Sequence, residues 1–411
     1  ALDPKRTIII AGHGFEAVSA AARAEDPEVE VVRQEAQLGT GHAVDQARAA
    51  LSDFDGTVIV LYGDCPLIQS RTLEELSATL SDSAVSVLGF EAKDPARYGR
   101  LITDGDKLKR IVEFKDASPA ERAVSLCNGG VMAASAGLLF DLLSEIDANN
   151  ASGELYLTDV IGKAVARGLP CTAVRCAERE TLGVNSRVEL MQAEKEFQNL
   201  RRTEALEDGV TMPAPETVHF SYDTVIGRDT IIEQNVVFGP GVTVESGAQI
   251  RAFSHLEGAH VSRGCIIGPY ARLRPGAELA EDVKIGNFVE IKASALEEGA
   301  KVNHLSYIGD AHIGARANIG AGTITCNADG ARKHHTRIGE EAFIGSNTML
   351  VAPVTVGQEA MTASGSVITQ DVPAGSLAIA RAKQDNKPGL ALKLMKKLRA
   401  LKAARRNKTK D

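Results

Sequence analysis

The sequence predicts two domains of different architecture: an α/β domain, then a long helix leading into a left-handed parallel β-helix of hexapeptide repeats. Short apolar runs alternate with helical segments up to residue 187, a charged helical stretch follows, and from residue 226 an aliphatic residue recurs at every sixth position. At 411 residues the chain is long enough for two hydrophobic cores. The predicted boundaries are 1–187 for the α/β domain, 188–212 for the helix, 213–380 for the β-helix and 381–411 for a basic tail.

In the first domain, four apolar runs have the length and the β-branched content of buried strands. They are Thr7–Ile10, Val29–Val32, Thr57–Leu61 and Val85–Leu88. Helical periodicity between them, as in 41–51 and 70–80, predicts a largely parallel sheet. Gly12-His13-Gly14 lacks the third glycine and the downstream acid of a dinucleotide-binding loop, so a strand-to-helix turn is predicted there.

The connecting helix is predicted from Val188 to Leu206, where apolar residues are interspersed among charged ones. Pro213 and Pro215 are expected to end it, because proline lacks the backbone donor that a helix interior needs.

The second domain is predicted from the six-residue period of its aliphatic side chains. These are Ile226, Ile232, Phe238, Val244, Ile250 and Leu256, then, after a slip of one, Val261, Ile267, Leu273, Leu279, Ile285 and Ile291, and finally Ile338, Ile344, Leu350, Val356 and Ile368. Each coil of such a solenoid is a triangle of three short strands whose aliphatic residues point inward. The flat outer faces favour a cyclic homotrimer with ligand sites between subunits. The period breaks across Lys292 to Gly330, where polar residues are dense, so the chemistry is expected there.

Bulk composition favours a cytoplasmic protein. No apolar stretch approaches the ~18 residues of a membrane span, and no charged-then-apolar leader opens the chain. Six cysteines without a C-x-x-C pair argue against a disulfide framework and against a zinc ribbon.

The tail from Arg381 to Asp411 carries twelve Lys or Arg against two acids, which leaves about -18 on the rest of a chain whose net charge is -8. A solvated helix end is favoured over binding to nucleic acid or to an anionic membrane, and the absence of Trp weakens the case for stacking on single-stranded nucleic acid. Leu394, Leu398 and Leu401 have helical spacing, so docking on a neighbouring subunit stays open.

Several motifs resemble a bacterial family of bifunctional enzymes, the N-acetylglucosamine-1-phosphate uridyltransferases that are also glucosamine-1-phosphate N-acetyltransferases. In the first half the motifs are the stretch from Gln34 to Ala43, Leu61-Tyr62-Gly63-Asp64, Tyr98-Gly99-Arg100 and Gly183-Val184-Asn185. In the second half they are Arg272 to Gly276, Gly286-Asn287-Phe288-Val289-Glu290, His304-Leu305-Ser306-Tyr307 and the stretch from Asn318 to Asn327. The resemblance implies an α/β nucleotidyltransferase of Rossmann-like fold before the acetyltransferase solenoid, and the synthesis of UDP-N-acetylglucosamine.

For acetyl transfer, the substrate amine must lose a proton to a base that titrates near neutral pH, which suits a histidine. The resemblance implies that His304 is this base and that Glu290 orients its ring or holds the substrate ammonium. It places Arg274 and Lys292 on the sugar phosphate, which suits a guanidinium fork and an ammonium. The other positions it implies are Tyr307 and Asn318 for the sugar, and Ala321, Asn327, Ala328, Ser346, Ser364 and Arg381 for acetyl-CoA.

For uridylyl transfer, a metal must neutralise the charge of the reacting phosphates. Asp64 directly follows an aliphatic strand, so its carboxylate is expected at the carboxyl edge of the sheet. The resemblance implies that Asp64 and Asn185 bind Mg²⁺. It further implies contacts to UTP from Gln34, Gly39, Thr40, Tyr62 and Gly63, and contacts to N-acetylglucosamine-1-phosphate from Gly99, Glu113 and Asn128.

Two departures from the family pattern shape the expectations. Ala328 stands where the family has Tyr, which predicts weaker binding of acetyl-CoA. The family's opening strand and its Leu-Ala-Ala-Gly-x-Gly-Thr-Arg-Met loop do not precede Thr7, so uridylyl transfer is expected to be impaired if these 411 residues are the whole polypeptide.

Three other functions are compatible with parts of the sequence. One is an acetyltransferase with a degenerate front domain. Another is a γ-class carbonic anhydrase, which His304 and His312 suggest although a third histidine at suitable spacing is not evident. The last is a regulatory scaffold, which the joint presence of His304, Glu290, Arg274 and Lys292 disfavours.

Overall fold

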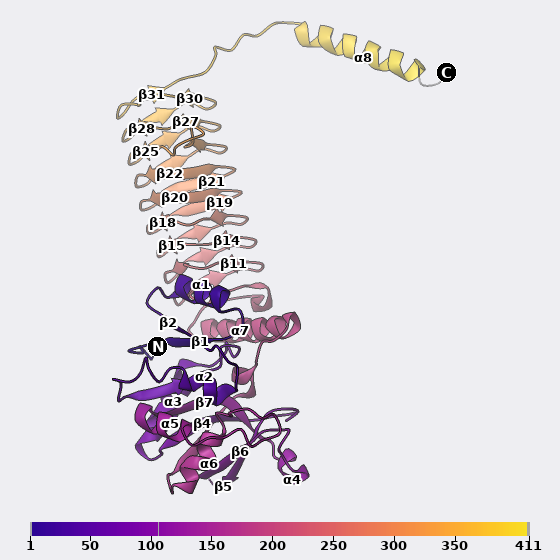
Figure 1. Ribbon diagram of the computed structural model, residues 1–411. Helices are drawn as coiled ribbons and strands as arrows, with labels where there is room; N and C mark the ends of the chain where they lie inside the picture. Colours follow the sequence, from indigo (N-terminus) through magenta and orange to yellow (C-terminus); the bar gives the residue numbers. More distant parts are fainter. Residues whose placement is uncertain (1, 106, 409–411) are drawn as a thin grey trace. The chain divides into compact units, whose positions relative to one another are not determined.

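The computed structural model describes residues 2–105 and 107–408, which divide between Phe197 and Gln198 into two compact units (Figure 1). The division lies inside the long helix α7, Arg187–Glu207, which confirms the predicted connecting helix. The helix ends at Glu207, ahead of the prolines, and Gly209 two residues later has a φ of 92° that suits glycine after a helix end. Among the described residues no helix is both long and apolar enough to cross a membrane.

The first unit contains a two-stranded sheet and a six-stranded sheet. Its strands are β1 Ile8–Ala11, β2 Glu30–Arg33, β3 Thr57–Val60, β4 Val85–Glu91, β5 Arg100–Asp104, β6 Lys107–Val112, β7 Leu126–Ser135 and β8 Cys171–Cys176. Its helices before α7 are α1 Phe15–Glu25, α2 Thr40–Asp45, α3 Ser70–Ala78, α4 Pro119–Arg122, α5 Ala136–Leu143 and α6 Asp159–Ala166. The four strands predicted here are confirmed, three of them within one residue at each end, whereas the fourth continues three residues beyond the predicted Leu88.

The prediction of a largely parallel sheet is wrong for the six-stranded sheet, whose order is β3-β7-β4-β8-β6-β5. Only β4 and β8 pair in parallel, whereas β7 runs antiparallel to both β3 and β4. The ten-residue strand β7 separates β3 from β4, which are successive strands of the α/β alternation. The alternation predicts a parallel crossover between neighbouring strands, whereas insertion of a later strand between them leaves no sign in the local periodicity.

The second unit is a left-handed parallel β-helix whose coils stack through three flat faces. The first face consists of β10 Ile231–Ile232, β13 Gln249–Ile250, β16 Ile266–Ile267, β19 Lys284–Asn287, β21 Lys301–His304, β23 Asn318–Ile319, β26 Phe343–Ile344, β29 Met361–Thr362 and β31 Leu377–Ala378. The second face consists of β11 Val237–Phe238, β14 His255–Leu256, β17 Arg272–Leu273, β24 Ile324–Cys326, β27 Met349–Val351 and β30 Val367–Ile368. The third face consists of β9 Val225–Ile226, β12 Thr243–Val244, β15 Ala259–Val261, β18 Ala277–Leu279, β25 Thr336–Ile338 and β28 Val354–Val356. Strands β20 Glu290–Leu296 and β22 Tyr307–Ile313 run through the second face and on into the third.

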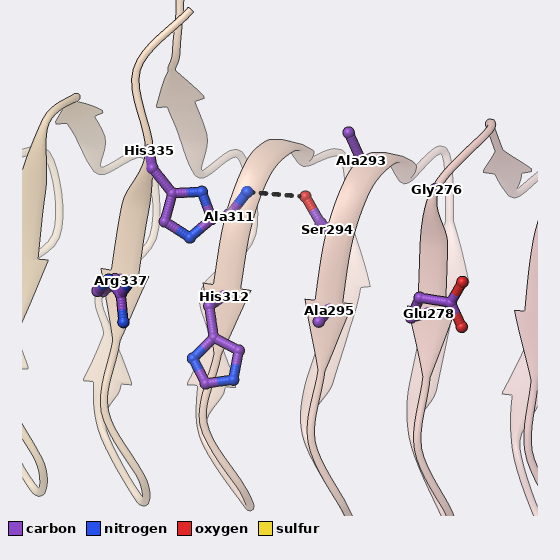
Figure 2. A pocket seen from close by; sticks show the side chains of 9 residues that line it. All are labelled: Gly276, Glu278, Ala293, Ser294, Ala295, Ala311, His312, His335 and Arg337. Carbon is purple, nitrogen blue, oxygen red and sulfur yellow. Dashed lines mark hydrogen bonds between the residues drawn. The ribbon is translucent and has the colours of Figure 1, made fainter.

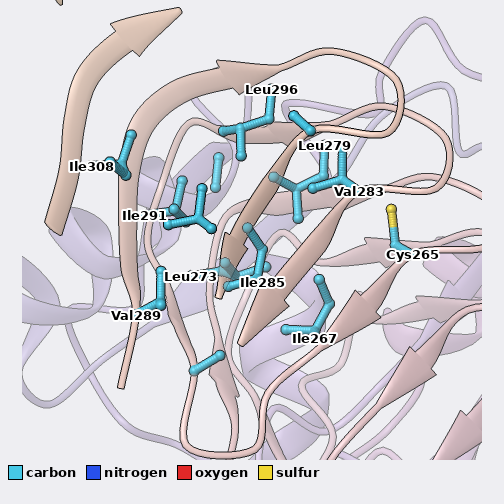
Figure 3. Packing of buried hydrophobic residues seen from close by; sticks show 14 of the residues in the cluster. Cys265, Ile267, Leu273, Leu279, Val283, Ile285, Val289, Ile291, Leu296 and Ile308 are labelled. Carbon is cyan, nitrogen blue, oxygen red and sulfur yellow. The ribbon is translucent and has the colours of Figure 1, made fainter. Parts of the chain in front are cut away.

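The six-residue aliphatics form the core of this unit, as predicted. Ile267, Leu273, Ile285 and Ile291 are at most 1% exposed and pack in the interior (Figure 3). Burial of each such side chain contributes roughly 1.5–3 kcal/mol relative to exposure.

The predicted break across Lys292 to Gly330 is not a break in the fold. The inward positions continue through Leu296, Val302, Ile308, Ile313 and Ile319, with steps of five or six residues. A five-residue step at one corner of a coil moves the register by one residue. The stretch therefore does not follow a strict six-residue period. The one true insertion in this stretch is a hairpin between β24 and β25.

After β31 an exposed segment leads to helix α8, Leu390–Lys408. Leu394, Leu398 and Leu401 lie on this helix and are more than half exposed. The helix itself agrees with the predicted helical spacing.

Candidate active sites

In the solenoid, the base predicted by resemblance lies where the first face turns into the second. His304 ends β21, and the parallel register places it beside Asn287 of the preceding coil. The His304 Nδ1 and Asn287 Oδ1 atoms are 2.8 Å apart. Phe288 and Leu305 turn the two coils at this corner with φ of 56° and 51°. The ring of His304 is exposed, so a ligand can reach it.

Glu290 begins the second face and has a different partner from the one predicted. Its Oε1 accepts a hydrogen bond of 2.7 Å from Arg274 Nη1, and this bond raises the pKa of the Arg274 guanidinium. The residue that bonds the His304 ring is instead Asn287. The sequence resemblance indicated Glu290, whereas the strand register places Asn287 beside the His304 ring.

The remaining predicted sugar and phosphate ligands lie mostly on the second face. Tyr307 is paired with Glu290 in the parallel register, and Lys292 with Gly309. The Tyr307 hydroxyl accepts a hydrogen bond of 3.3 Å from Asn327 Nδ2. Asn318 begins β23 and therefore lies on the first face.

The inserted hairpin carries Asn327 and Ala328, and an antiparallel bridge joins Ala328 to Lys333. Asp329 shapes its tip by accepting a 2.7 Å hydrogen bond from the His334 ring and further bonds from two backbone N–H groups. These bonds hold the pKa of Asp329 far below its ordinary value. The hairpin also exposes Arg332 and Lys333, two cations that the prediction left out although the Asp-Gly turn signals a hairpin.

The small residues predicted to contact acetyl-CoA follow one corner of successive coils. The backbone N–H of Asn347 donates to Ala321 O at 2.7 Å, and that of Gly365 donates to Ser346 O at 2.8 Å. Ser364 precedes Gly365 in the same column, whereas Arg381 lies in the exposed segment after β31. Ser346 and Ser364 are exposed, so this column presents small polar side chains to solvent.

In the first unit, the structure brings Thr40, Tyr62 and Glu113 together. The phenol of Tyr62 bonds Thr40, and burial, with the nearby Glu113 charge, raises the pKa of Tyr62 to about 12. Glu113 Oε1 accepts from the Thr158 hydroxyl at 3.1 Å, and burial raises the pKa of Glu113. Gly99 lies against this carboxyl group, since a Cβ on Gly99 would be 3.4 Å from its oxygens.

The other predicted nucleotide and sugar contacts adjoin this group. Gln34 Nε2 donates to Gly39 O at 3.3 Å, and Thr40 follows Gly39 directly. The Asn128 backbone N–H donates to Gly99 O at 2.8 Å. Gly63 separates Tyr62 from Asp64, and a Cβ there would meet no atom within 4 Å. The predicted ligands from five separate segments therefore belong to one connected region.

Asp64 and Asn185 also lie together, as a shared metal site requires. A Cβ on Gly183 would be 3.5 Å from Asp64 Oδ2 and 3.7 Å from Asn185 Nδ2, and the Val184 N–H donates to Asp64 O at 2.8 Å. Within the described part of the chain no cluster of three or more His, Cys, Asp or Glu suits a metal. One carboxylate and one amide oxygen nevertheless fit Mg²⁺, which takes few protein ligands and keeps waters or substrate phosphates.

The third face of the solenoid has a shallow groove of about 450 Å³ (Figure 2). Gly276, Ala293, Ser294, Ala295 and Ala311 form its small-residue part, and Glu278, His312, His335 and Arg337 its polar part. The zinc alternative needs His304 and His312 together, yet His312 Nε2 lies 3.0 Å from Glu297 on the third face, and His304 lies at the opposite corner.

Comparison with known proteins places the chain among relatives of nearly the same length. The model of the hexapeptide repeat of succinyl-transferase matches residues 335–370. The bifunctional protein GlmU of Jannaschia sp. (strain CCS1) is 60% identical over 410 residues, covering 100% of this chain and 90% of the relative. GlmU of Ruegeria sp. (strain TM1040) is 64% identical over 405 residues, covering 98% and 90%.

Among solved structures, a nucleoside-diphosphate-sugar pyrophosphorylase from Vibrio cholerae RC9 aligns over 45% of this chain and 79% of its own, with 14% identity and a TM-score of 0.35. The relatives found by sequence, at 60–64% identity, show the family of this chain.

Replacement of Glu113 by Gln should stabilise the first unit near neutral pH. Because the folded pKa of Glu113 is raised, its ionisation opposes folding, so stability falls as the pH rises above about 4.3, the ordinary Glu value. Gln keeps an acceptor for Thr158 and carries no charge. We expect the midpoint of thermal unfolding to rise by about 2–4 °C near neutral pH and the gain to shrink toward pH ~4. A gain independent of pH would contradict this account.

Proposed function

The chain belongs to the family of the bifunctional protein GlmU and is a bifunctional transferase that makes UDP-N-acetylglucosamine, and we propose that its two units divide the two reactions. The solenoid transfers the acetyl group of acetyl-CoA to glucosamine-1-phosphate. The α/β unit then transfers a uridylyl group from UTP to the N-acetylglucosamine-1-phosphate formed. The observation that carries this division is that the exposed His304 ring and the Arg274–Glu290 pair belong to the second unit, whereas Asp64 belongs to the first.

In acetyl transfer, His304 Nε2 takes a proton from the substrate amine as the amine nitrogen attacks the thioester carbon. The carbon–sulfur bond then breaks, and the proton on Nε2 passes to the leaving thiolate, giving CoA and the acetylated sugar phosphate. Glu290 can hold the substrate as an ammonium, because its second oxygen is free of the bond to Arg274 Nη1. The ammonium loses one proton to solvent before the neutral amine attacks.

Binding of the sugar phosphate falls to the cations on the second face. Arg274 is fixed by Glu290 and keeps its charge, since that bond raises its pKa. Lys292 projects from β20, the same strand as Glu290. A guanidinium held by a carboxylate and a flexible ammonium together suit a phosphate monoester.

In uridylyl transfer, Asp64 and Asn185 would hold Mg²⁺, which neutralises charge on the reacting phosphates. Tyr62 stays protonated at physiological pH, since its pKa is about 12, and so remains a hydrogen-bond donor. We assign Gln34, Gly39 and Thr40 to the uracil base, which would replace the bond between Gln34 Nε2 and the Gly39 carbonyl with bonds of its own. Gly99, Glu113 and Asn128 contact one another, and we assign them to the hydroxyl groups of the sugar. We place the enzyme in the cytoplasm, where UTP and acetyl-CoA are available.

Two substitutions should separate the activities. His304→Ala should lower kcat for acetyl transfer about 10²–10⁴-fold, the usual contribution of a general base, and leave pyrophosphate release from UTP unchanged. Asp64→Ala should lower pyrophosphate release from UTP and leave acetyl transfer unchanged. Each variant is the control for the other, and both assays are run on the same full chain. A fully active His304→Ala protein would remove the proposed base.

Restoring the family aromatic at Ala328 should strengthen acetyl-CoA binding. Ala328 lies on the hairpin next to Asn327, where an added ring gains apolar contact with the cofactor at little cost to the fold. We expect Ala328→Tyr to lower the Michaelis constant for acetyl-CoA several-fold, consistent with ~1 kcal/mol of contact. An unchanged constant would refute the role assigned to this position.

We further propose a homotrimer, because from β12 to β31 the exposed large apolar side chains of the solenoid lie on the first face, the second face and the corner between them. Phe253, Tyr270 and Phe288 stack along the corner between the first and second faces, with centroids 4.9 and 5.1 Å apart, although each is about half exposed. Other exposed apolar residues flank this corner, namely Phe343, Met361 and Leu377 on the first face and Ile324, Val351 and Val367 on the second.

The third face from β12 onward is polar by contrast. Its outward residues are Thr243, His260, Glu278, Ala295, His312, Arg337 and Thr355. Three copies with the aromatic corner at the axis would bury the apolar faces and leave the third face in water. Asn318 on the first face of one copy would then lie opposite the second face of the next.

Tyr270→Asp should dissociate the assembly, because it places a carboxylate in the middle of the ring stack. Asp tolerates the φ of 56° at this position, so the backbone of the monomer is not strained. Light scattering on the eluting protein should show a loss of mass to about one chain. Thr243→Asp on the third face is the matched control and should leave the trimer intact. A trimeric Tyr270→Asp protein would place the axis elsewhere.

A further inference from the structure

The bond between His304 and Asn287 determines which ring nitrogen can act as the base. The Asn287 amide oxygen cannot donate a hydrogen, so at 2.8 Å the His304 Nδ1 atom must carry the proton of this bond. In the neutral ring the lone pair is then on Nε2, the atom on the far side of the ring from Asn287.

We propose that Asn287 is a positioning residue for acetyl transfer, which fixes the tautomer and the orientation of His304 so that Nε2 faces the substrate amine. This inference rests on the proposed function of His304. It adds a residue for which the sequence resemblance implied no role, and it gives Asn287 the task that was expected of Glu290.

The local structure holds both partners in place. Parallel pairing of β19 with β21 puts the two Cα atoms in register. The carbonyl of His304 accepts hydrogen bonds from the Gly322 N–H at 3.1 Å and from the Ser306 hydroxyl at 2.8 Å. These bonds anchor the backbone of His304. Its side-chain torsions χ1 and χ2 remain, and the bond to Asn287 restricts both.

The competing candidate for this task is engaged elsewhere. Glu290 bonds Arg274, and it begins the second face beyond the corner residue Phe288, whereas Asn287 lies before that corner on the same face as His304. A neutral amide also differs from a carboxylate in its effect, because it orients the ring without adding a negative charge beside it.

The test compares two substitutions of similar size at Asn287. Asn287→Leu removes the acceptor, and Asn287→Asp keeps an oxygen in its place. We expect Leu to lower kcat for acetyl transfer about 10–100-fold, with the Michaelis constants of both substrates nearly unchanged, and Asp to stay within about tenfold of the parent. A purely structural role predicts similar losses for Leu and Asp. Equal kcat values for the two variants, or a fully active Leu variant, would overturn the inference.

Two controls keep this comparison interpretable. Uridylyl transfer by the same molecule should be unchanged in both variants, and Asn199→Leu on the exposed side of α7 should leave both activities intact. In a His304→Ala background, Asn287→Leu should have no further effect on kcat, because Asn287 acts through the ring. A further loss of rate in that background would show that Asn287 acts independently of His304, and would overturn the proposal even if the Leu variant were less stable.

The outcomes for the two residues are separable. A fully active His304→Ala protein defeats the proposed function, whatever Asn287 does. An inactive His304→Ala protein together with a fully active Asn287→Leu protein defeats the positioning role alone.

Discussion

Parallel stacking of the solenoid coils is the interaction on which the acetyltransferase site depends. Aliphatic residues such as Ile267, Ile285 and Val302 lie above one another in the interior, and their burial fixes the register of each strand against the next. Once the interior is in register, the outward residues are in register too. The core therefore positions functional side chains that contribute nothing to its own packing.

This register explains why residues far apart in the chain meet. Asn287 and His304 are 17 residues apart, one coil in length, and their side chains bond at 2.8 Å. Glu290 and Tyr307 are paired in the same way on the next face. The corner residues Phe288 and Leu305, with positive φ, separate the first pair from the second, so the proposed base and the proposed phosphate-binding cations lie on either side of a turn. The proposed site is thus spread over two faces of the solenoid.

In the first unit, the proposed site gathers polar side chains that come from separate segments of the chain. Glu113 is held in a site that raises its pKa, at a cost to stability that sugar binding can offset. Tyr62 and Thr40 share a hydrogen bond beside it. Asp64 and Asn185 come from separate segments and meet beside Gly183, where the absence of a side chain leaves room for both.

By itself, the sequence determined the architecture of the second unit, the connecting helix and the types of residue at both sites, because a six-residue aliphatic period and local motifs are properties of short stretches of chain. Tertiary structure alone decided that β7 inserts antiparallel between β3 and β4, and that the inward positions of the coils continue from Leu296 to Ile319, inside the predicted break. It also decided that Asn287, rather than Glu290, bonds the ring of His304. Each of these depends on which strands lie side by side, and long-range pairing leaves no mark on local periodicity.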